Sequence, residues 1–198
     1  DAESNFGKQL DSLSDVVTSG VVPGIVVYQL FKLSGNRVLD FDLNSYMNPI
    51  FNLDLVFSIS PVAFIAFLIT LGSAVRLAKF NTIDYADEFE GLPTPANALF
   101  FVALPLLIDH VYLVESKEYL LNNYTLIMLT ISSVILMNVP FRLFSLRLSL
   151  RKYDYNIFKI LTIVLSIPII LLFGLGGFSL VIILYLFLNV IRNLWSLI

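Results

Sequence analysis

Six long apolar stretches constrain the fold of this chain more than any other feature, because each approaches the length that a helix needs to cross a bilayer. They are Leu10–Leu33, Leu55–Phe80, Pro95–Val114, Tyr124–Val139, Ile157–Phe173 and Phe178–Leu194. Hydrophobic residues make up 58% of the 198 residues and charged residues 14%, whereas soluble domains have roughly 45–50% and about 25%. We therefore expect an all-α integral membrane protein, a polytopic helical bundle with about six transmembrane helices in a single domain over residues 1–198.

The basic residues predict how these helices are oriented, because Lys and Arg concentrate on the cytoplasmic side of membrane proteins. Of the 12 Lys and Arg residues, the opening segment, the 76–94 and 140–156 loops and the C-terminal spans carry most. These are Lys8, Arg76, Lys79, Arg142, Arg147, Arg151, Lys152, Lys159 and Arg192, against Lys32, Arg37 and Lys117 on the other side. We expect a multi-pass protein of the cell membrane with those loops in the cytoplasm. The glycines of the FGLGGFS segment predict a tight turn that pairs the last two spans as a hairpin.

Composition also excludes several classes of function. A net charge of −3 leaves no basic footprint for nucleic acid. The chain has no cysteine, which excludes disulfides, thiolate metal sites and a cysteine nucleophile. Its single histidine, His110, falls on the predicted outer side, and we assign it no chemistry.

Three polar or small residues near the start of the chain recur every four residues. Gly7, Asp11 and Asp15 advance by only about 40° per step on a helix, so they share one face. Two carboxylates at this spacing can reach one divalent cation, or one can bind the cation while the other takes a proton. The alternative is that both are solvated acidic residues stabilised by the dipole at the start of a helix.

Three motifs in order along the chain resemble those of the CDP-alcohol phosphatidyltransferase family. GKQLDSLSD (Gly7–Asp15) is similar to the second half of the family signature, G-x-x-x-D-x-x-x-D. SAVRLAKFN (Ser73–Asn81) and FEGLPTPANA (Phe89–Ala98) resemble the phosphatidylserine synthase branch. The resemblance covers about residues 1–98, and residues 99–198 would add further transmembrane helices.

This resemblance implies a metal-dependent enzyme that transfers the phosphatidyl group of CDP-diacylglycerol to L-serine and releases CMP. It implies Mg²⁺ or Mn²⁺ as cofactor, surrounding membrane lipids and a homodimer. Asp11 and Asp15 would hold the metal, and Asp15 would also act as the general base. The substrate-binding residues would be Gly7, Arg76, Lys79, Asn81, Pro93 and Thr94.

The sequence also departs from the family pattern. The first half of the signature, D-x-x-D-G-x-x-A-R, is absent, so we expect an N-terminally truncated fragment. Lys79 stands where arginine is common, and Ser19 replaces a frequent aromatic residue.

Three other functions stay open on sequence alone. The first is a related transferase that uses glycerol phosphate or inositol phosphate. The second is a transporter or channel that binds ions at Asp11 and Asp15, although such proteins carry further ionisable residues in mid-span and this chain has essentially none. The third is an inactive membrane scaffold.

Overall fold

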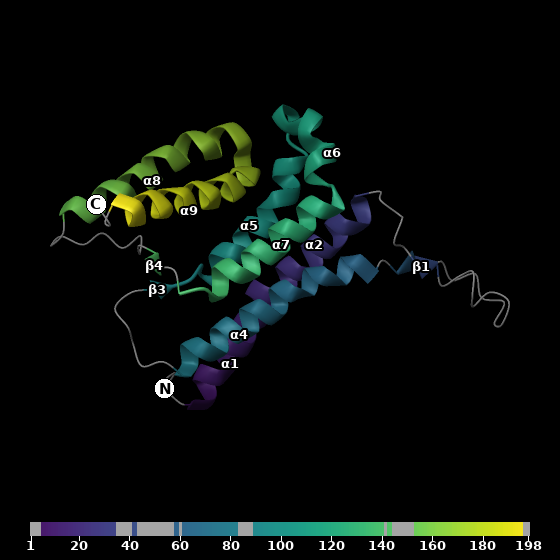
Figure 1. The fold of residues 1–198 in the computed structure, drawn as a ribbon, viewed down its shortest axis with the longest axis horizontal. Coiled ribbons are helices and arrows are strands. Elements are labelled where there is room, and N and C mark those ends of the chain that lie inside the picture. The colour runs from purple at the N-terminus through teal and green to yellow at the C-terminus, as the bar shows by residue number, and fades with distance from the viewer. Residues whose placement is uncertain are drawn as a thin grey trace.

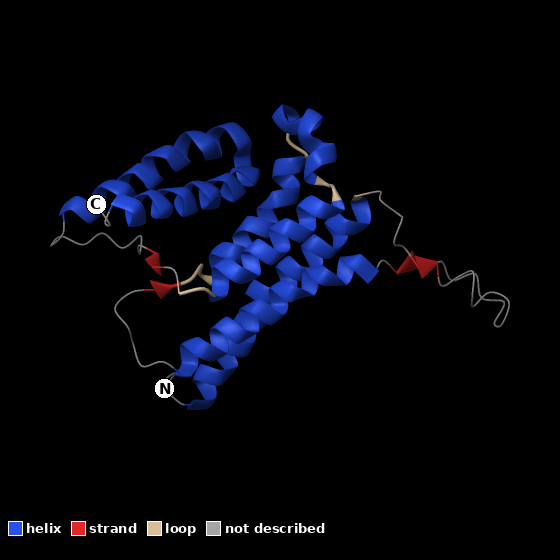
Figure 2. Ribbon diagram, in the orientation of Figure 1, coloured by secondary structure: helices blue, strands red, loops and turns tan. Residues whose placement is uncertain are grey.

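The computed structural model describes residues 5–34, 41–42, 58–59, 61–82, 89–140, 142–143 and 153–195. In these residues the chain is helical apart from four two-residue strands and short connecting turns (Figures 1 and 2). The α-helices are α1 (Asn5–Val16), α2 (Val22–Leu33), α4 (Leu68–Thr82), α5 (Thr94–Ile108), α6 (Lys117–Leu120), α7 (Asn123–Asn138), α8 (Tyr153–Phe173) and α9 (Gly177–Trp195). The shorter elements are the π-helix η1 (Val17–Val21) and the 3₁₀ helices η3 (Pro61–Phe67), η4 (Val111–Ser116) and η5 (Gly174–Gly176). Strand β1 (Phe41–Asp42) pairs antiparallel with β2 (Ser58–Ile59), and β3 (Phe89–Glu90) pairs antiparallel with β4 (Arg142–Leu143).

The first expected span is one continuous helical rod, α1–η1–α2, with a π-turn in its middle. The π-turn is closed by the Val22 N–H, which donates to the Val17 carbonyl five residues back. A π-turn inserts an extra residue into a helix, so it rotates the face of everything on one side of it relative to the other. Sequence periodicity did not predict this feature.

Small residues let α4 approach the rod closely. The Thr70 hydroxyl donates to the Gly20 carbonyl at 3.0 Å and the Ser73 hydroxyl donates to the Ser19 carbonyl at 3.3 Å. A Cβ added at Gly20 would lie only 3.1 Å from the Cβ of Ser73. Ser19 is itself buried, and its carbonyl accepts the bond from α4, so a small residue at this position is compatible with the close helix packing.

Two expected span boundaries were wrong. The second span does not begin at Leu55, because Ser58 and Ile59 form β2 and the helix starts at Pro61. The third does not continue to Val114, because α5 ends at Ile108 and the chain turns by 95° into η4 and α6. Lys117 donates to Asp109 at this bend with an N–O distance of 2.6 Å. That hydrogen bond, together with the lysine charge, lowers the pKa of the Asp109 carboxyl.

The last two expected spans form a helical hairpin, as the glycine-rich turn predicts. Helices α8 and α9 pack against one another and reverse direction at η5 (Figure 1). Gly174 has a φ of +58°, in the left-handed region that favours glycine. Through α9 and η5 the hairpin packs on α5.

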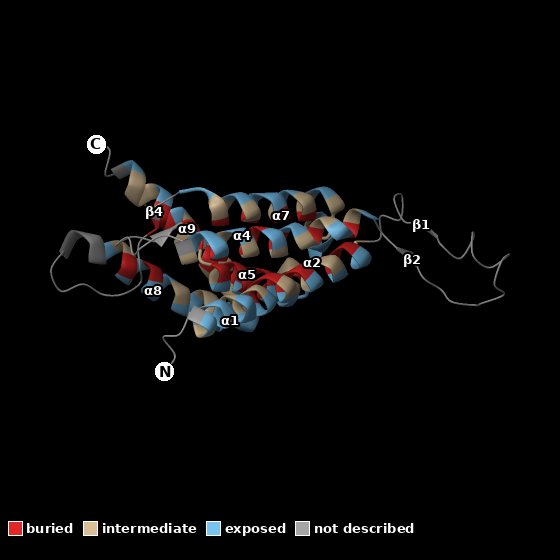
Figure 3. Cartoon of the chain, turned by 90° about the horizontal axis from the view of Figure 1, so that it is seen from below, coloured by how far each residue is buried: buried red, intermediate tan, exposed pale blue. Residues whose placement is uncertain are grey.

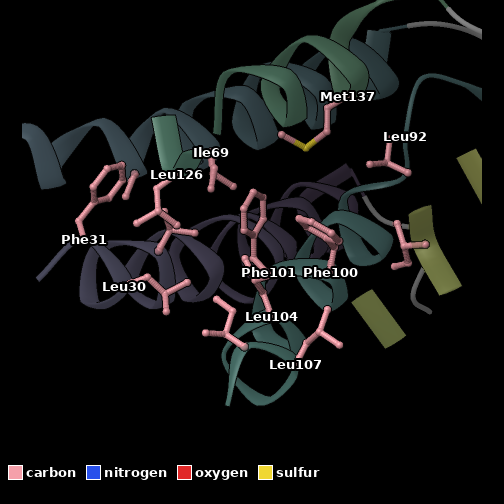
Figure 4. Packing of buried hydrophobic residues seen from close by; sticks show 14 of the residues in the cluster. Leu30, Phe31, Ile69, Leu92, Phe100, Phe101, Leu104, Leu107, Leu126 and Met137 are labelled. Carbon is pink, nitrogen blue, oxygen red and sulfur yellow. The ribbon is translucent and has the colours of Figure 1, made fainter. Parts of the chain in front are cut away.

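Buried side chains lie between the helices, and the outward faces are apolar as well. Phe101, Ile69, Leu126 and Met137 are fully buried at the centre of the core (Figure 4). Figure 3 shows exposed residues along the outward faces of the helices. On α8 these include Ile160, Val164 and Leu171, the last of them 80% exposed. A helix that is apolar both inside and outside is suited to lipid rather than to water.

By length and composition, three helical stretches could cross a membrane, or four if the bent pair at α5 counts as one span. They are Gln9–Leu33, Pro61–Asn81 and Ile157–Leu194, with the bent pair Thr94–Ile108 and Val111–Leu120. The third stretch contains both arms of the α8–α9 hairpin. The chain is thus a helical membrane protein, and the number of crossings remains a prediction.

Candidate active site

The alternating direction of the helices brings several element ends to one end of the molecule. The start of α1 lies beside the end of α4, and the β3–β4 pair lies beside the start of α5 and the end of α7 (Figure 1). The motifs singled out in the sequence lie on α1, on α4 and at the β3–α5 junction. The fold therefore brings the three motifs, which are distant in the sequence, to one end.

Asp11 and Asp15 lie in the regular α-helical part of α1, directly before the π-turn. Residues four apart in an α-helix have Cβ atoms about 6 Å apart, so both carboxylates can reach one ligand. Asp11 is exposed, whereas Asp15 is half-buried, as is Gly7 one turn before Asp11. The predicted shared face is thus confirmed for these three residues.

Two carboxylates on one face fit a hard divalent cation, which prefers oxygen ligands and completes its shell with water and phosphate oxygens. Among the described residues, no group of three or more His, Cys, Asp or Glu side chains could hold a metal ion by itself. The acidic residues of the 83–88 segment lie outside the described residues. The donor set present on α1 therefore suits a metal shared with a phosphate-bearing substrate.

A hydrogen bond joins α1 to the end of α4 beside these carboxylates. The Asn81 amide donates to the Ser12 hydroxyl with an N–O distance of 2.8 Å. Ser12 follows Asp11 directly, so Asn81 fixes the position of the aspartate-bearing turn relative to α4. Asn81, expected to bind substrate, acts in this structure as a link between the two helices.

Arg76 and Lys79 occupy the last two turns of α4 and differ in their surroundings. The Arg76 side chain is partly buried, and its Nε atom is buried without a hydrogen-bond partner among the described residues. Lys79 is exposed. A buried guanidinium nitrogen is costly unless it is paired, so Arg76 is the stronger candidate of the two for a role in binding an anion.

Pro93 and Thr94 begin α5 at a tightly constrained turn. Gly91 has a φ of +71°, and a Cβ added there would lie 2.4 Å from the Met137 carbonyl oxygen. The Leu92 N–H donates to the Leu136 carbonyl at 2.8 Å, which holds the turn against the end of α7. Thr94 is buried. Helix α5 packs on η1, the turn that directly follows Asp15, and Figure 1 shows the start of α5 toward the same end of the bundle as α1.

Sequence reasoning missed the polar side chains of α7. The buried Ser133 hydroxyl donates to the Asn97 amide oxygen at 2.6 Å. Asn138, in the last turn of α7, donates through Nδ2 to Gly72 O at 3.2 Å and to Val134 O at 3.0 Å. Ser133 thus bonds to a residue of the third motif and Asn138 contacts the helix that carries the second, yet isolated polar residues in an apolar stretch give no periodic signal.

Curated proteins with related sequences carry serine-transferase names. A CDP-diacylglycerol--serine O-phosphatidyltransferase of Methanocaldococcus jannaschii is 34% identical over 113 residues, 57% of this chain and 42% of that protein. One of Helicobacter pylori is 24% identical over 198 residues, 98% of this chain and 70% of that protein. An archaetidylserine synthase of Methanothermobacter thermautotrophicus is 34% identical over 95 residues, 48% of this chain and 30% of that protein.

The chain thus spans less than half the length of the two archaeal relatives. No family model matches it. Five curated relatives match in all, and each is named as a serine phosphatidyltransferase or an archaetidylserine synthase. Together with the ordered motifs at one end of the bundle, these relatives show that the chain is similar to the phosphatidylserine synthase branch of the CDP-alcohol phosphatidyltransferase family.

Proposed function

We propose that this protein transfers the phosphatidyl group of CDP-diacylglycerol to the hydroxyl of L-serine, giving phosphatidylserine and CMP. The observation that carries the proposal is the pair Asp11 and Asp15, held against the Arg76-bearing helix by the bond between Ser12 and Asn81. The names of the relatives support serine as the alcohol.

In this reaction the serine hydroxyl oxygen forms a bond to the lipid-side phosphorus. The bond from that phosphorus to the bridging oxygen breaks, and the oxygen leaves with CMP. Asp15 accepts the hydroxyl proton, because a half-buried carboxylate can approach a substrate while staying partly shielded from water. General-base catalysis of this kind contributes about 10²–10⁴ in rate.

Asp11 and Asp15 would hold Mg²⁺ or Mn²⁺ against the diphosphate of the donor, and the cation would neutralise charge that develops on the phosphate oxygens. Gly7, one turn earlier on the same face, leaves room for the donor to lie against α1. Arg76 would bind the carboxylate of serine, with Lys79 adding positive charge at the membrane surface. Pro93 and Thr94 would line the same site from α5.

We further propose six membrane crossings, formed by α1–α2, η3–α4, α5, α7, α8 and α9. Successive helices in this set run in opposite directions, which supports this count, although α7 is shorter than a typical span. The site would then face the cytoplasm at the cell membrane, where most Lys and Arg residues lie. The functional unit would be a homodimer.

The test is CMP release by the purified full-length protein from CDP-diacylglycerol, with and without Mn²⁺ or Mg²⁺. Separate reactions contain L-serine, glycerol phosphate or inositol phosphate. We expect metal-dependent CMP release with L-serine, and phosphatidylserine as the lipid product. Turnover with a phosphorylated alcohol in place of serine would refute the choice of substrate, and absence of CMP in every reaction would refute the enzymatic function.

A further inference from the structure

Asn138 lies at the end of α7, where this helix crosses α4 at Gly72. Gly72 is one helical turn before Arg76 on α4. Its amide Nδ2 is 3.2 Å from the Gly72 carbonyl oxygen on α4 and 3.0 Å from the Val134 carbonyl oxygen on its own helix. The helices are close here because residue 72 is glycine: a Cβ added there would lie 3.1 Å from Val134 Cγ1. Two hydrogen bonds to backbone carbonyls, one on each helix, therefore fix the position of the Asn138 side chain.

These two contacts also determine which way the amide faces. Both partners are carbonyl oxygens, which only accept hydrogen bonds, so the amide nitrogen must point to them and Oδ1 must point away. The Oδ1 atom is buried and has no hydrogen-bond partner among the described residues. A buried acceptor left unpaired destabilises the folded protein.

Arg76, one helical turn after Gly72 on α4, presents the complementary unmet atom. Its Nε is a buried donor without a partner in the described part of the chain. In the α-helical register of α4, the carbonyl of residue 72 accepts from the N–H of residue 76. The side chain of a helical residue also leans toward the preceding turn. The base of the Arg76 side chain is therefore next to the carbonyl that Asn138 contacts.

We propose that Asn138 is a positioning residue for Arg76. The two unmet atoms are not hydrogen-bonded to each other in this structure, and a rotation of the Arg76 side chain would let the Asn138 Oδ1 accept from the Arg76 Nε–H and hold the guanidinium in place. This pairing satisfies both unmet atoms at once. The terminal nitrogens of Arg76 then stay available, as a planar fork, for a carboxylate. The inference rests on the proposed function, in which that carboxylate belongs to serine, and it adds a residue that the motifs do not contain.

The first test compares kinetic constants of Asn138→Leu, Arg76→Lys and the double variant. A hydrogen bond to a charged group is worth enough to change affinity by about tenfold or more. We expect Asn138→Leu to raise the KM for serine by about that factor and to leave the KM for CDP-diacylglycerol within about twofold. Lysine has no Nε–H, so in the Arg76→Lys background the same substitution should add little. An equal rise in both backgrounds would show that Asn138 acts independently of Arg76 and would overturn the proposal.

Two further variants separate positioning from packing. Asn138→Asp keeps an acceptor oxygen but loses the amide donors to Gly72 and Val134, so it should lower thermal stability while serine KM stays nearer to wild type than in Asn138→Leu. Asn189→Leu is the matched control, because Asn189 also donates to a carbonyl four residues back, Tyr185 O at 2.8 Å, on α9. It should leave the KM for serine unchanged. If Asn138→Asp is as impaired in serine KM as Asn138→Leu, the acceptor has no role and the proposal fails.

A measurement without substrate keeps the inference testable if serine proves not to be the alcohol. The melting temperatures of wild type, Asn138→Leu, Arg76→Lys and the double variant form a double-mutant cycle. If the two side chains pair, the loss in the double variant will be smaller than the sum of the single losses. An additive result would refute the pairing, whereas coupling in a protein that releases no CMP with serine would refute only the proposed function.

Discussion

Asp11 and Asp15 are one turn apart on α1 but differ in exposure, since Asp11 is exposed and Asp15 is half-buried. Asn81 links to Ser12, between them, and not to either carboxylate. Both carboxylates are therefore available to ligands, with the second better shielded from water. This difference suits distinct roles in metal binding and in proton transfer.

Replacing each aspartate by asparagine separates these roles, because asparagine keeps the shape and removes the charge. We expect Asp15→Asn to lower kcat by about 10²–10⁴ while CDP-diacylglycerol still binds. Asp11→Asn should weaken donor binding, and excess Mn²⁺ should restore it in part. The measurement is donor affinity and CMP release across a Mn²⁺ titration. Normal donor binding by Asp11→Asn at low metal, together with loss in Asp15→Asn, would reverse the assignment.

Gly91 is a second residue whose role is local and testable. Alanine at this position must adopt a φ of +71° and must place its Cβ against the Met137 carbonyl. The left-handed conformation alone costs about 1–2 kcal/mol, and the clash adds to it. We expect Gly91→Ala to lower the melting temperature of the purified protein clearly. Gly174→Ala is the control: it has a φ of +58° but open space around an added Cβ, so it should show only the smaller conformational cost. Equal losses in the two variants would contradict this account.

For single residues, the sequence predicted features that follow from spacing along one helix. It missed features that depend on packing between helices. The four-residue interval identified the shared face of Gly7, Asp11 and Asp15 because a helix maps spacing directly onto direction. It could not identify Asn138, which matters only because glycine at position 72 lets α7 approach α4. Nor could it predict that Arg76 is partly buried and Lys79 exposed, since burial depends on helices that are distant in the sequence.

Among the elements, the π-turn η1 determines which way the aspartate-bearing face of α1 points relative to α2. It lies between the aspartates and the apolar helix α2, and the hydroxyls of Thr70 and Ser73 bond to its Gly20 and Ser19 carbonyls. Such turns are frequent at functional sites. With one residue fewer, the rod would be a continuous α-helix, and α1 would be rotated by about 100° relative to α2.

Deleting Val17 tests this role directly. We expect the shortened rod to stay helical, while rotation of α1 breaks the bond between Ser12 and Asn81 and abolishes CMP release. Circular dichroism and the melting temperature report the fold, and CMP release reports the site. Val17→Ala, which keeps the chain length at an exposed position, is the control and should remain active. Full activity after the deletion would mean that the π-turn does not orient the carboxylates.

The positions of most helices were predictable from hydropathy alone. The expected span Tyr124–Val139 matches α7 almost to the residue, and Ile157–Phe173 matches α8 except for its first turn. The failures lie where apolar residues continue past the end of a helix. After Ile108 the polar pair Asp109 and His110 is followed by further apolar residues, and the chain bends by 95° between the two helices. Averaged hydropathy passes over such a short polar pair and carries no information on backbone direction.

For the whole molecule, the prediction that matters most is its orientation in the membrane. The chain has no cysteine, so single cysteines introduced at Asn44, Ser116 and Ser149 report topology without a background signal. We expect labelling from outside at Asn44 and Ser116 and from inside at Ser149, since Lys and Arg favour the cytoplasmic side. Impermeant maleimide on intact cells makes the distinction. An outside label at Ser149 would invert the arrangement and place the aspartates on the outer surface.

The bond between Ser12 and Asn81 joins residues 69 positions apart, and this separation has a consequence for biosynthesis. A ribosome makes about 5–20 residues per second, so α1 is synthesised several seconds before the end of α4. During that interval the aspartates have no Arg76 and no Asn81 beside them. A partly synthesised chain would therefore hold carboxylates without the rest of the site. Competence to use a reactive lipid donor would begin only after the second crossing, η3–α4, is in the membrane.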